Sequence, residues 1–220
     1  MALAPIDGIR YVWPTPIFGG MLPDHGTVNP GLRTHILDKE AASDSIGKSV
    51  AKGWHSAEDL TAESCAEMGH LFAFIKYALT QLTEVTTGLP AAEFETTDHI
   101  TAWAVVLRNG GYSRLHSHPG HAWSGVYYVD QGQPYQGSED AGCIEFIDPR
   151  TGVEMIPMPG NPYGGGISLR PEAGRLYCFP AWLKHQVHPF EGDGERISVA
   201  FNVRIDKFHV SRNAADQGNG

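Results

Sequence analysis

Three histidines are the residues of this sequence whose spacing most clearly indicates chemistry. His116 and His118 form a His-x-His pair. In an extended chain, residues two apart point to the same side, so both imidazoles could reach one metal ion. Pro119 favours an extended conformation for His118, and His185 would supply a third imidazole from a distant strand. Three neutral nitrogen ligands suit iron, zinc, copper or nickel rather than magnesium or calcium.

An arginine that follows His185 by 11 positions is the second candidate. From Arg196 to Ile205 the residues alternate between polar and apolar types, which predicts a strand with one apolar and one polar face. Arg196 and Ser198 share the polar face. A guanidinium pairs with a carboxylate through two parallel hydrogen bonds, and a neighbouring hydroxyl can complete the contact. The alternative is an ordinary surface arginine paired with an acid such as Glu195.

Other histidines compete for these roles. His188 lies three residues after His185, but we prefer His185 because it follows the strand-like run that ends at Pro180. His121 is the alternative at the first cluster, although its offset of three from His118 would not share a strand face. His70 falls in a predicted helix and is interpreted as a packed or surface residue.

Composition places the chain among globular proteins with many turns. Its 220 residues fit one domain, and 41% hydrophobic and 19% charged residues are ordinary values. The 26 glycines and 15 prolines favour a β-rich fold. The three cysteines form neither a zinc-type pair nor a disulfide framework, and no signal peptide or membrane span is recognisable. We therefore expect a cytoplasmic protein.

The net charge of −9 argues against a nucleic-acid partner, because phosphate binding needs clustered Lys and Arg. A small basic pocket for a carboxylate is compatible with this charge.

The first 97 residues are predicted to form an arm and supporting helices. Residues 10–20, broken by prolines, favour an edge strand or an extended arm. A first helix is expected over 29–38, and residues 41–54 are interpreted as a loop. Ser56 precedes Asp59 by three positions, which is typical of a helix start. The strongest helix covers 62–86, where apolar residues recur at three- and four-residue steps until Gly88 and Pro90.

From residue 98 to 206 the chain reads as short strands separated by turn signals, which is typical of a barrel or sandwich. The predicted strands are 100–108, 125–130, 143–147, 167–170, 175–179 and 196–205. Since the helices come first and the strands second, we expect the helices to pack outside a sheet. The apolar face of 196–205 should lie under the helices. Residues 211–220 are expected to be a flexible tail.

With these residues in hand, the chain resembles the iron(II)- and 2-oxoglutarate-dependent oxygenases, most closely a mainly bacterial subgroup of unknown substrate. The resemblance rests on an ordered set of motifs: Gly111-Tyr112, His116-x-His118-Pro119-Gly, Ser124-Gly-Val-Tyr-Tyr-Val129, Phe179-Pro180-x-Trp182-Leu-x-His185 and Glu195-Arg196-Ile-Ser198-Val-Ala-Phe-Asn202. It implies a double-stranded β-helix, which is a jelly-roll or cupin-like barrel with helices packed outside.

The resemblance further implies an Fe(II) cofactor bound by His116, His118 and His185, with 2-oxoglutarate as co-substrate. Arg196 and Ser198 match the residues that hold the distal carboxylate in this family. The implied activity is O2-dependent hydroxylation of a small molecule or of a peptide or protein side chain, with release of succinate and CO2.

The sequence departs from the family pattern at His118, where a carboxylate is usual. Either His118 is the third ligand, or it turns away and water takes the position. The departure also opens the alternative of a three-histidine dioxygenase that does not use 2-oxoglutarate, although Arg196 and Ser198 argue against it. A non-catalytic metal-binding, cupin-like module and a structural zinc site are two further alternatives.

Four further residues are candidates for the cofactor pocket: Tyr112, Tyr128, Trp103 and Asn202. Core packing is the competing interpretation for the three aromatic residues. Asn202 shares the polar face with Arg196 and could contact the co-substrate. The N-terminal helices could also support a homodimer.

Overall fold

The computed structural model describes residues 13–63, 65–155, 159 and 164–211. These residues form two α-helices, nine β-strands and three short 3-10 turns. The helices are α1 (His25–Ala42) and α2 (Ala66–Thr87), and the turns are η1 (Leu60–Ala62), η2 (Ala91–Glu93) and η3 (Val153–Met155). The strands are β1 (Phe18–Met21), β2 (Val50–His55), β3 (Phe94–His116), β4 (Trp123–Pro134), β5 (Ile144–Ile147), β6 (Gly166–Leu169), β7 (Arg175–Pro180), β8 (His185–Val187) and β9 (Gly192–Val210).

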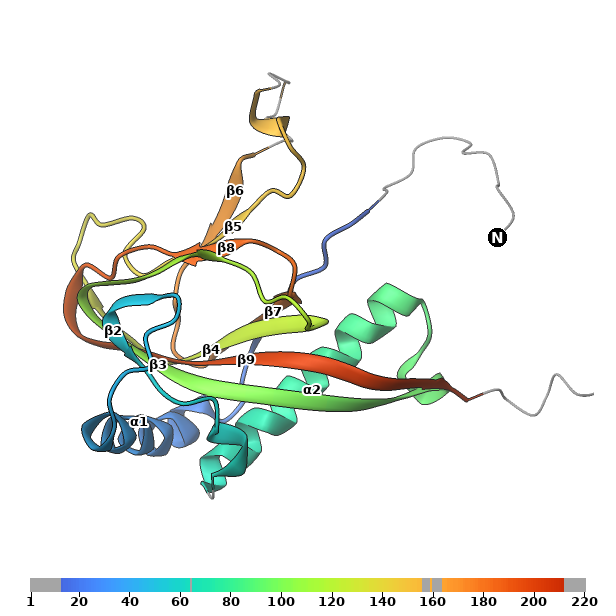
Figure 1. Ribbon diagram of the computed structural model, residues 1–220, viewed down its shortest axis with the longest axis horizontal. Coiled ribbons are helices and arrows are strands. Elements are labelled where there is room, and N and C mark those ends of the chain that lie inside the picture. Colours follow the sequence, from blue (N-terminus) through green and yellow to red (C-terminus); the bar gives the residue numbers. More distant parts are fainter. Residues whose placement is uncertain (1–12, 64, 156–158, 160–163, 212–220) are drawn as a thin grey trace, which may run out of the picture.

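The strands form one antiparallel sheet that curls into two layers (Figure 1). Their order is β1-β7-β4-β9-β3-β8-β5-β6, with β2 also paired to β3. Strand β3 belongs to both layers: residues 94–107 pair with β9, whereas Ser113 and His116 pair with β8. This architecture confirms the predicted β-rich, double-stranded β-helix with external helices.

A glycine pair lets β3 turn from one layer into the other. Gly110 has a φ of +82° and donates its N–H to Phe190 O at 2.7 Å, while Phe190 N donates to Gly111 O at 2.8 Å. A Cβ on Gly111 would lie 2.8 Å from Lys52 O, so a larger residue would not fit. The prediction that the strand ends at residue 108 was therefore wrong: β3 continues through this corner to His116.

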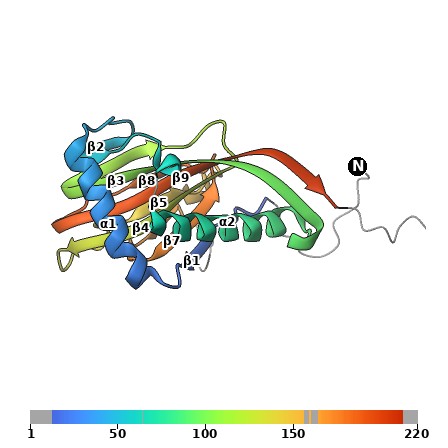
Figure 2. The same ribbon diagram turned by 90° about the horizontal axis from the view of Figure 1, so that it is seen from below.

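Both helices cover one face of the layer that contains β3, β9, β4 and β7 (Figure 2). The main core lies between the helices and the apolar face of this layer. Helix α2 begins at Ala66 rather than at residue 62. Its apolar stripe is confirmed, and it ends at Thr87, where Gly88 with a φ of +73° forms the C-cap. Opposite the helices lie Ile197, Val199, Phe201 and Val203 of β9, as expected from the alternation. The polar face of β9 is thereby left to face the interior between the two layers.

Three predictions for the N-terminal part need correction. Helix α1 begins at His25 rather than residue 29 and contains Pro30. Residues 50–55, expected as loop, form β2. The register of β2 with β3 shifts between Ala51 and Gly53, and buried and exposed residues do not alternate along β2. Ser56 starts no helix: its hydroxyl accepts from Ala104 N at 2.9 Å and donates to Ala57 O at 2.6 Å, which ties the chain to β3.

The described part of the arm behaves as predicted, since β1 lies at an edge of the sheet beside β7. Residues 10–12 of that arm, and all of the predicted tail except Ser211, lie outside the described residues.

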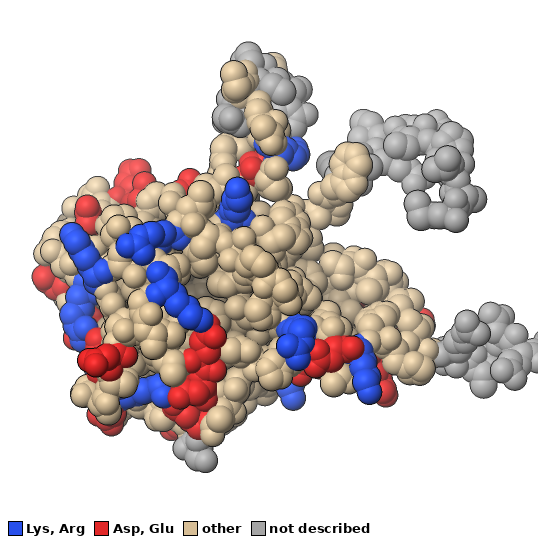
Figure 3. Space-filling model, viewed as in Figure 1, with Lys and Arg blue, Asp and Glu red and all other residues tan. Residues whose placement is uncertain are grey.

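Charge on the surface is mixed. On the face shown in Figure 3, Lys and Arg side chains are interleaved with Asp and Glu rather than gathered into one basic area. Neither helix of the described part of the chain is long and apolar enough to cross a membrane.

A substitution at Gly125 in β4 can test how closely β4 packs against its neighbours β7 and β9. A Cβ there would lie 2.2 Å from the Phe201 ring and 2.6 Å from Tyr177 O, so we expect Gly125→Ala to lower the free energy of unfolding by about 1–3 kcal/mol. Gly69→Ala on the exposed side of α2 is the matched control. Its Cβ would meet nothing within 4 Å, and it should raise stability by about 0.5–1 kcal/mol. Urea denaturation measures both, and equal effects of the two substitutions would contradict this packing.

Candidate metal and co-substrate site

The three predicted histidines come together between the two layers. His116 ends β3 and is the register partner of His185, the first residue of β8. His118 follows just after β3, where its backbone N–H donates to Ala181 O at 2.8 Å. One ring nitrogen of each histidine lies within 4.8 Å of the other two. This arrangement can hold one metal ion.

The hydrogen bonds of two rings prepare them to bind a metal. His116 Nδ1 lies 2.6 Å from Arg114 O, and His185 Nδ1 lies 2.9 Å from Leu183 O. A carbonyl oxygen only accepts, so each Nδ1 must carry the proton. Each Nε2 then presents its lone pair to the centre of the cluster, which is the usual role of such backbone contacts at metal sites.

His118 completes the cluster from a third direction. Its Nε2 lies 3.4 Å from Nε2 of His185, whose lone pair points toward it. Two such nitrogens are brought together either by a proton on His118 or by a shared cation. The His118 ring is therefore directed at the centre of the cluster.

Burial keeps the three rings neutral. It lowers the pKa of His118 to about 3, with further lowering from His185, His116, His121 and Lys48. Burial, together with His116, lowers the pKa of His185 to about 4, and burial lowers the pKa of His116 as well. Neutral imidazoles have free lone pairs, so protons do not compete with a metal near neutral pH.

The competing histidines lie elsewhere. His188 Nε2 is 3.0 Å from a carboxylate oxygen of Glu145 and takes no part in the cluster. His70 lies on the exposed side of α2, and His121 lines a neighbouring cavity instead.

Arg196 lies in the same pocket, in a setting that is costly for a cation. Only 1% of its surface is exposed, and within the described residues no carboxylate pairs with it. Its Nε donates to Gly142 O at 3.0 Å, while Nη2 is buried without a hydrogen-bond partner. Burial lowers its pKa. A guanidinium buried without a counter-charge indicates a place for an anion.

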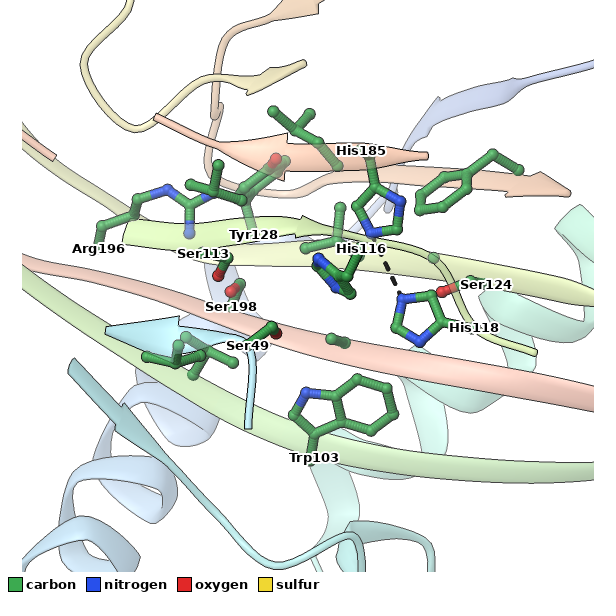
Figure 4. A pocket seen from close by; sticks show the side chains of 18 residues that line it. Ser49, Trp103, Ser113, His116, His118, Ser124, Tyr128, His185, Arg196 and Ser198 are labelled. Atoms are coloured by element: carbon green, nitrogen blue, oxygen red, sulfur yellow. Dashed lines mark hydrogen bonds between the residues drawn. The ribbon is translucent and has the colours of Figure 1, made fainter. Parts of the chain in front are cut away.

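Tyr128 and Ser198 surround the guanidinium. The carbon atom of the guanidinium lies 4.9 Å from the centre of the Tyr128 ring, and the buried Tyr128 hydroxyl also lacks a hydrogen-bond partner. Burial raises the pKa of Tyr128 to about 12, so the hydroxyl keeps its proton and can donate it. Ser198 is the register partner of Tyr128 and lines the same pocket. In Figure 4 these residues occupy one end of the pocket and His118 the other.

The other pocket candidates are placed differently from one another. Trp103 lines the pocket at the histidine end. Tyr112 does not line it; its neighbour Ser113, on the opposite face of the strand, does. Asn202 lines the adjoining cavity beside the histidines rather than the Arg196 end.

Sequence reasoning missed Gly142, which shapes the arginine site. It has a φ of +66°, and a Cβ there would lie 2.9 Å from Arg196 Cδ. Gly142 lies in the run Ala-Gly-Cys before a predicted strand, which signals a turn but not its contact with a residue more than fifty positions away. Ser49, on the loop before β2, also lines the pocket and was missed.

Residues 101–202 match a family model described as "Putative 2OG-Fe(II) oxygenase". This segment contains all three clustered histidines and Arg196. Over this segment, a little under half of the chain, the sequence is similar to the iron(II)- and 2-oxoglutarate-dependent oxygenases.

Solved structures of several other proteins share this fold at low sequence identity. A Pseudomonas putida prolyl-4-hydroxylase is 14% identical, with a TM-score of 0.59, 86% of this chain and 91% of the other covered. HygX from Streptomyces hygroscopicus, with nickel, 2-oxoglutarate and hygromycin B bound, is 12% identical, with a TM-score of 0.59 and coverage of 94% and 91%. A Trichoplax adhaerens prolyl hydroxylase in complex with a hypoxia-inducible-factor peptide is 12% identical, with a TM-score of 0.59 and coverage of 86% and 83%. A search of curated proteins found no match.

The choice between His185 and His188 as a metal ligand can be tested with a matched pair of variants. His185→Ala removes a nitrogen from the cluster and should abolish tight Mn(II) binding. His188→Ala removes only the contact with Glu145 and should leave metal affinity within about twofold of wild type. Electron paramagnetic resonance titration with Mn(II) measures both affinities. The reverse order of effects would assign the ligand to His188.

A second pair tests His118. If His118 is a ligand, His118→Ala should weaken Mn(II) binding by at least about tenfold. His118→Asp should bind Mn(II) more tightly than wild type when 2-oxoglutarate is absent, because the carboxylate adds a negative charge next to the cation. Calorimetric titration gives both values. Unchanged affinity in His118→Ala would mean that water can take this position at no cost.

Proposed function

We propose that this protein is an Fe(II)- and 2-oxoglutarate-dependent dioxygenase, a hydroxylase whose iron is held by His116, His118 and His185. Arg196 binds the distal carboxylate of 2-oxoglutarate. The observation that carries the proposal is the buried guanidinium without a counter-ion, in the same pocket as three inward-facing imidazoles.

The residues present fit both groups. Two imidazoles have their Nε2 lone pairs set by backbone carbonyls, and neutral nitrogen donors suit iron(II). The unpartnered atoms Arg196 Nη2 and Tyr128 Oη are both hydrogen-bond donors. A carboxylate bound there would satisfy both and neutralise the guanidinium. Ser198 adds a third donor on the same side.

When bound, iron(II) and 2-oxoglutarate supply the oxidising chemistry, in which O2 is consumed and succinate and CO2 are released. The chain positions and shields these groups. Arg196 and Tyr128 fix one end of the co-substrate, which directs its other end toward the histidines. Apolar side chains of Val126, Ile144 and Phe179 line the walls between and keep water away from the reacting atoms.

The neutral ligand set makes the charge of the co-substrate important. Three imidazoles leave the +2 charge of the metal uncompensated, and Arg196 adds another positive charge. A dianion placed between them is attracted by both. We therefore expect metal and 2-oxoglutarate to strengthen each other's binding more than in a site that already contains a carboxylate.

A three-histidine dioxygenase without 2-oxoglutarate is the second candidate, and the all-imidazole cluster is the observation that favours it. Such an enzyme would have no use for a buried arginine in the pocket unless its own substrate were an anion. The unpaired Arg196 therefore favours the 2-oxoglutarate-dependent reaction.

The proposal also covers the class of the primary substrate, the cellular location and the oligomeric state of the protein. Of the structurally similar proteins, one was solved with a peptide and another with hygromycin B, so both a small molecule and a peptide or protein side chain are compatible with the fold. Three free thiols are consistent with a cytoplasmic location. A homodimer stays a prediction.

Spectroscopy and product analysis test the reaction. Anaerobic addition of iron(II) and 2-oxoglutarate should produce a weak visible charge-transfer band, and admission of air should release succinate. Absence of both, with iron bound, would leave a metal-binding module. Oxygen consumption without dependence on 2-oxoglutarate would favour the second candidate. Metal analysis of the purified protein distinguishes iron from zinc.

Arg196→Met offers a test that separates binding from folding. The substitution removes an unpaired buried cation and keeps an unbranched side chain, so stability without ligand should be equal to or higher than that of wild type. With Mn(II) present, saturating 2-oxoglutarate should stabilise the wild type by about 2.7 kcal/mol at one hundred times its Kd. It should not stabilise the variant. Thermal unfolding with and without 2-oxoglutarate measures both, and a ligand-induced shift in Arg196→Met would refute the assignment.

A further inference from the structure

A second cavity adjoins the metal site at the end opposite Arg196. Its volume is about 340 Å3, and His116 and His118 line both this cavity and the pocket that contains Arg196. We call it the outer chamber. The ring nitrogens of the cluster lie between the two spaces, so a molecule in the outer chamber would face the metal from the other side. The volume is at the lower end of the range for small-molecule sites.

Strand β9 shows that the outer chamber is too far from Arg196 for the co-substrate to fill it. Arg196 and Asn202 project from the same face, six residues apart, which corresponds to roughly 20 Å along a strand. Arg196 lies in the inner pocket and Asn202 in the outer chamber. A five-carbon diacid anchored on Arg196 and directed at the histidines would end well before Asn202.

Two buried polar atoms point to a ligand in the outer chamber. Asn202 is 7% exposed, and its Oδ1 has no hydrogen-bond partner among the described residues. Nδ1 of His121, which also lines the chamber, likewise has no hydrogen-bond partner among the described residues. A buried carbonyl oxygen without a donor is destabilising, because the hydrogen bond it makes with water is lost and not replaced. A ligand that carries hydrogen-bond donors would satisfy it.

The charges on the chamber wall cancel. Lys48 and Glu58 are its basic and acidic side chains, respectively, within the described residues, and they form an ion pair with each other. The remaining polar groups are uncharged hydroxyls, an amide and imidazoles. Burial also lowers the pKa of His55, which keeps that ring neutral. An anionic or cationic ligand would find no free counter-charge here.

An aromatic surface forms part of the wall. The His55 ring stacks on Trp103 with centroids 5.6 Å apart and an interplanar angle of 8°, and both residues line the chamber. Around them lie hydroxyl groups of Ser49, Ser117 and Thr101. A flat apolar surface bordered by donors and acceptors suits a ring that has hydrogen-bonding groups at its edge and C–H bonds on its face.

From these observations we infer that the outer chamber binds a small, uncharged, hydroxyl-rich ring, of the size of a monosaccharide or cyclic polyol, with Asn202 Oδ1 accepting from one of its hydroxyls. This inference rests on the proposed function, because the ring would be the primary substrate, presented to the metal across His118. Its face would rest on the aromatic surface formed by Trp103 and His55.

The experiment uses the full chain loaded with Mn(II) and 2-oxoglutarate, and Zn(II) as the diamagnetic control. The probes are methyl glucoside and myo-inositol, with glucosamine and glucuronate as charged counterparts. Mn(II) should broaden the proton signals of the neutral probes relative to Zn(II), because they bind beside the metal. The charged probes should bind at least about tenfold more weakly, which corresponds to about 1.4 kcal/mol.

Different failures have different meanings. If 2-oxoglutarate binds but neither neutral probe is broadened, or if a charged probe binds more tightly, the inferred substrate class is wrong and the proposed function stands. If the protein binds neither Mn(II) nor 2-oxoglutarate, the proposed function fails and this inference fails with it.

The variant Asn202→Leu tests whether Asn202 contacts the neutral probes. It removes the acceptor at similar volume and should weaken binding of the neutral probes by roughly threefold to tenfold. Gln81→Leu is the matched control, because it removes an amide from α2, which packs against the opposite side of the sheet, and should leave probe affinity unchanged. Equal affinities in Asn202→Leu and wild type would exclude Asn202 as the contact.

Discussion

A guanidinium enclosed by protein and left without a carboxylate is the constraint on which the rest of this site depends. Removing a cation from water costs several kcal/mol even after relaxation, and Arg196 recovers only part of that through Gly142 O and the Tyr128 ring. The burial of apolar side chains in the surrounding core offsets this desolvation free energy. A site that is unfavourable when empty is well suited to a ligand that brings the missing negative charge.

Strand β9 contributes both to the main core and to the site of the buried arginine, because its apolar and polar residues alternate. Ile197, Val199, Phe201 and Val203 face the helices and form part of the main core. Arg196 and the other residues of the polar face are thereby directed into the interior between the layers. Since the side-chain period of a strand is two, a slip of one residue would exchange the two faces. The apolar contacts with α1 and α2 therefore also determine where the arginine points.

Much of this arrangement could be predicted from the sequence, because it depends on local patterns. The alternation after Arg196 and the His-x-His pair are each contained in a few residues. What could not be predicted depends on pairing between distant segments. Strand β8 is only three residues long and is too short to show an alternating pattern. The sequence around Gly142 indicates a turn, but the contact of Gly142 with Arg196 is visible only in the folded structure. The corner at Gly110 was interpreted as the end of a strand for the same reason.

The replacement of a carboxylate by His118 changes the balance between the two ends of the pocket. In a site with a carboxylate ligand, the metal is held partly by that charge, and the co-substrate meets a weaker net attraction. In the site proposed here the three ligands are neutral, so a bound metal would depend more on the anion that joins it. Arg196, at the other end, attracts the same anion. If the proposed roles hold, metal, co-substrate and arginine are linked through one dianion, and a substitution that weakens its contact with Arg196 should also weaken metal binding at the histidines.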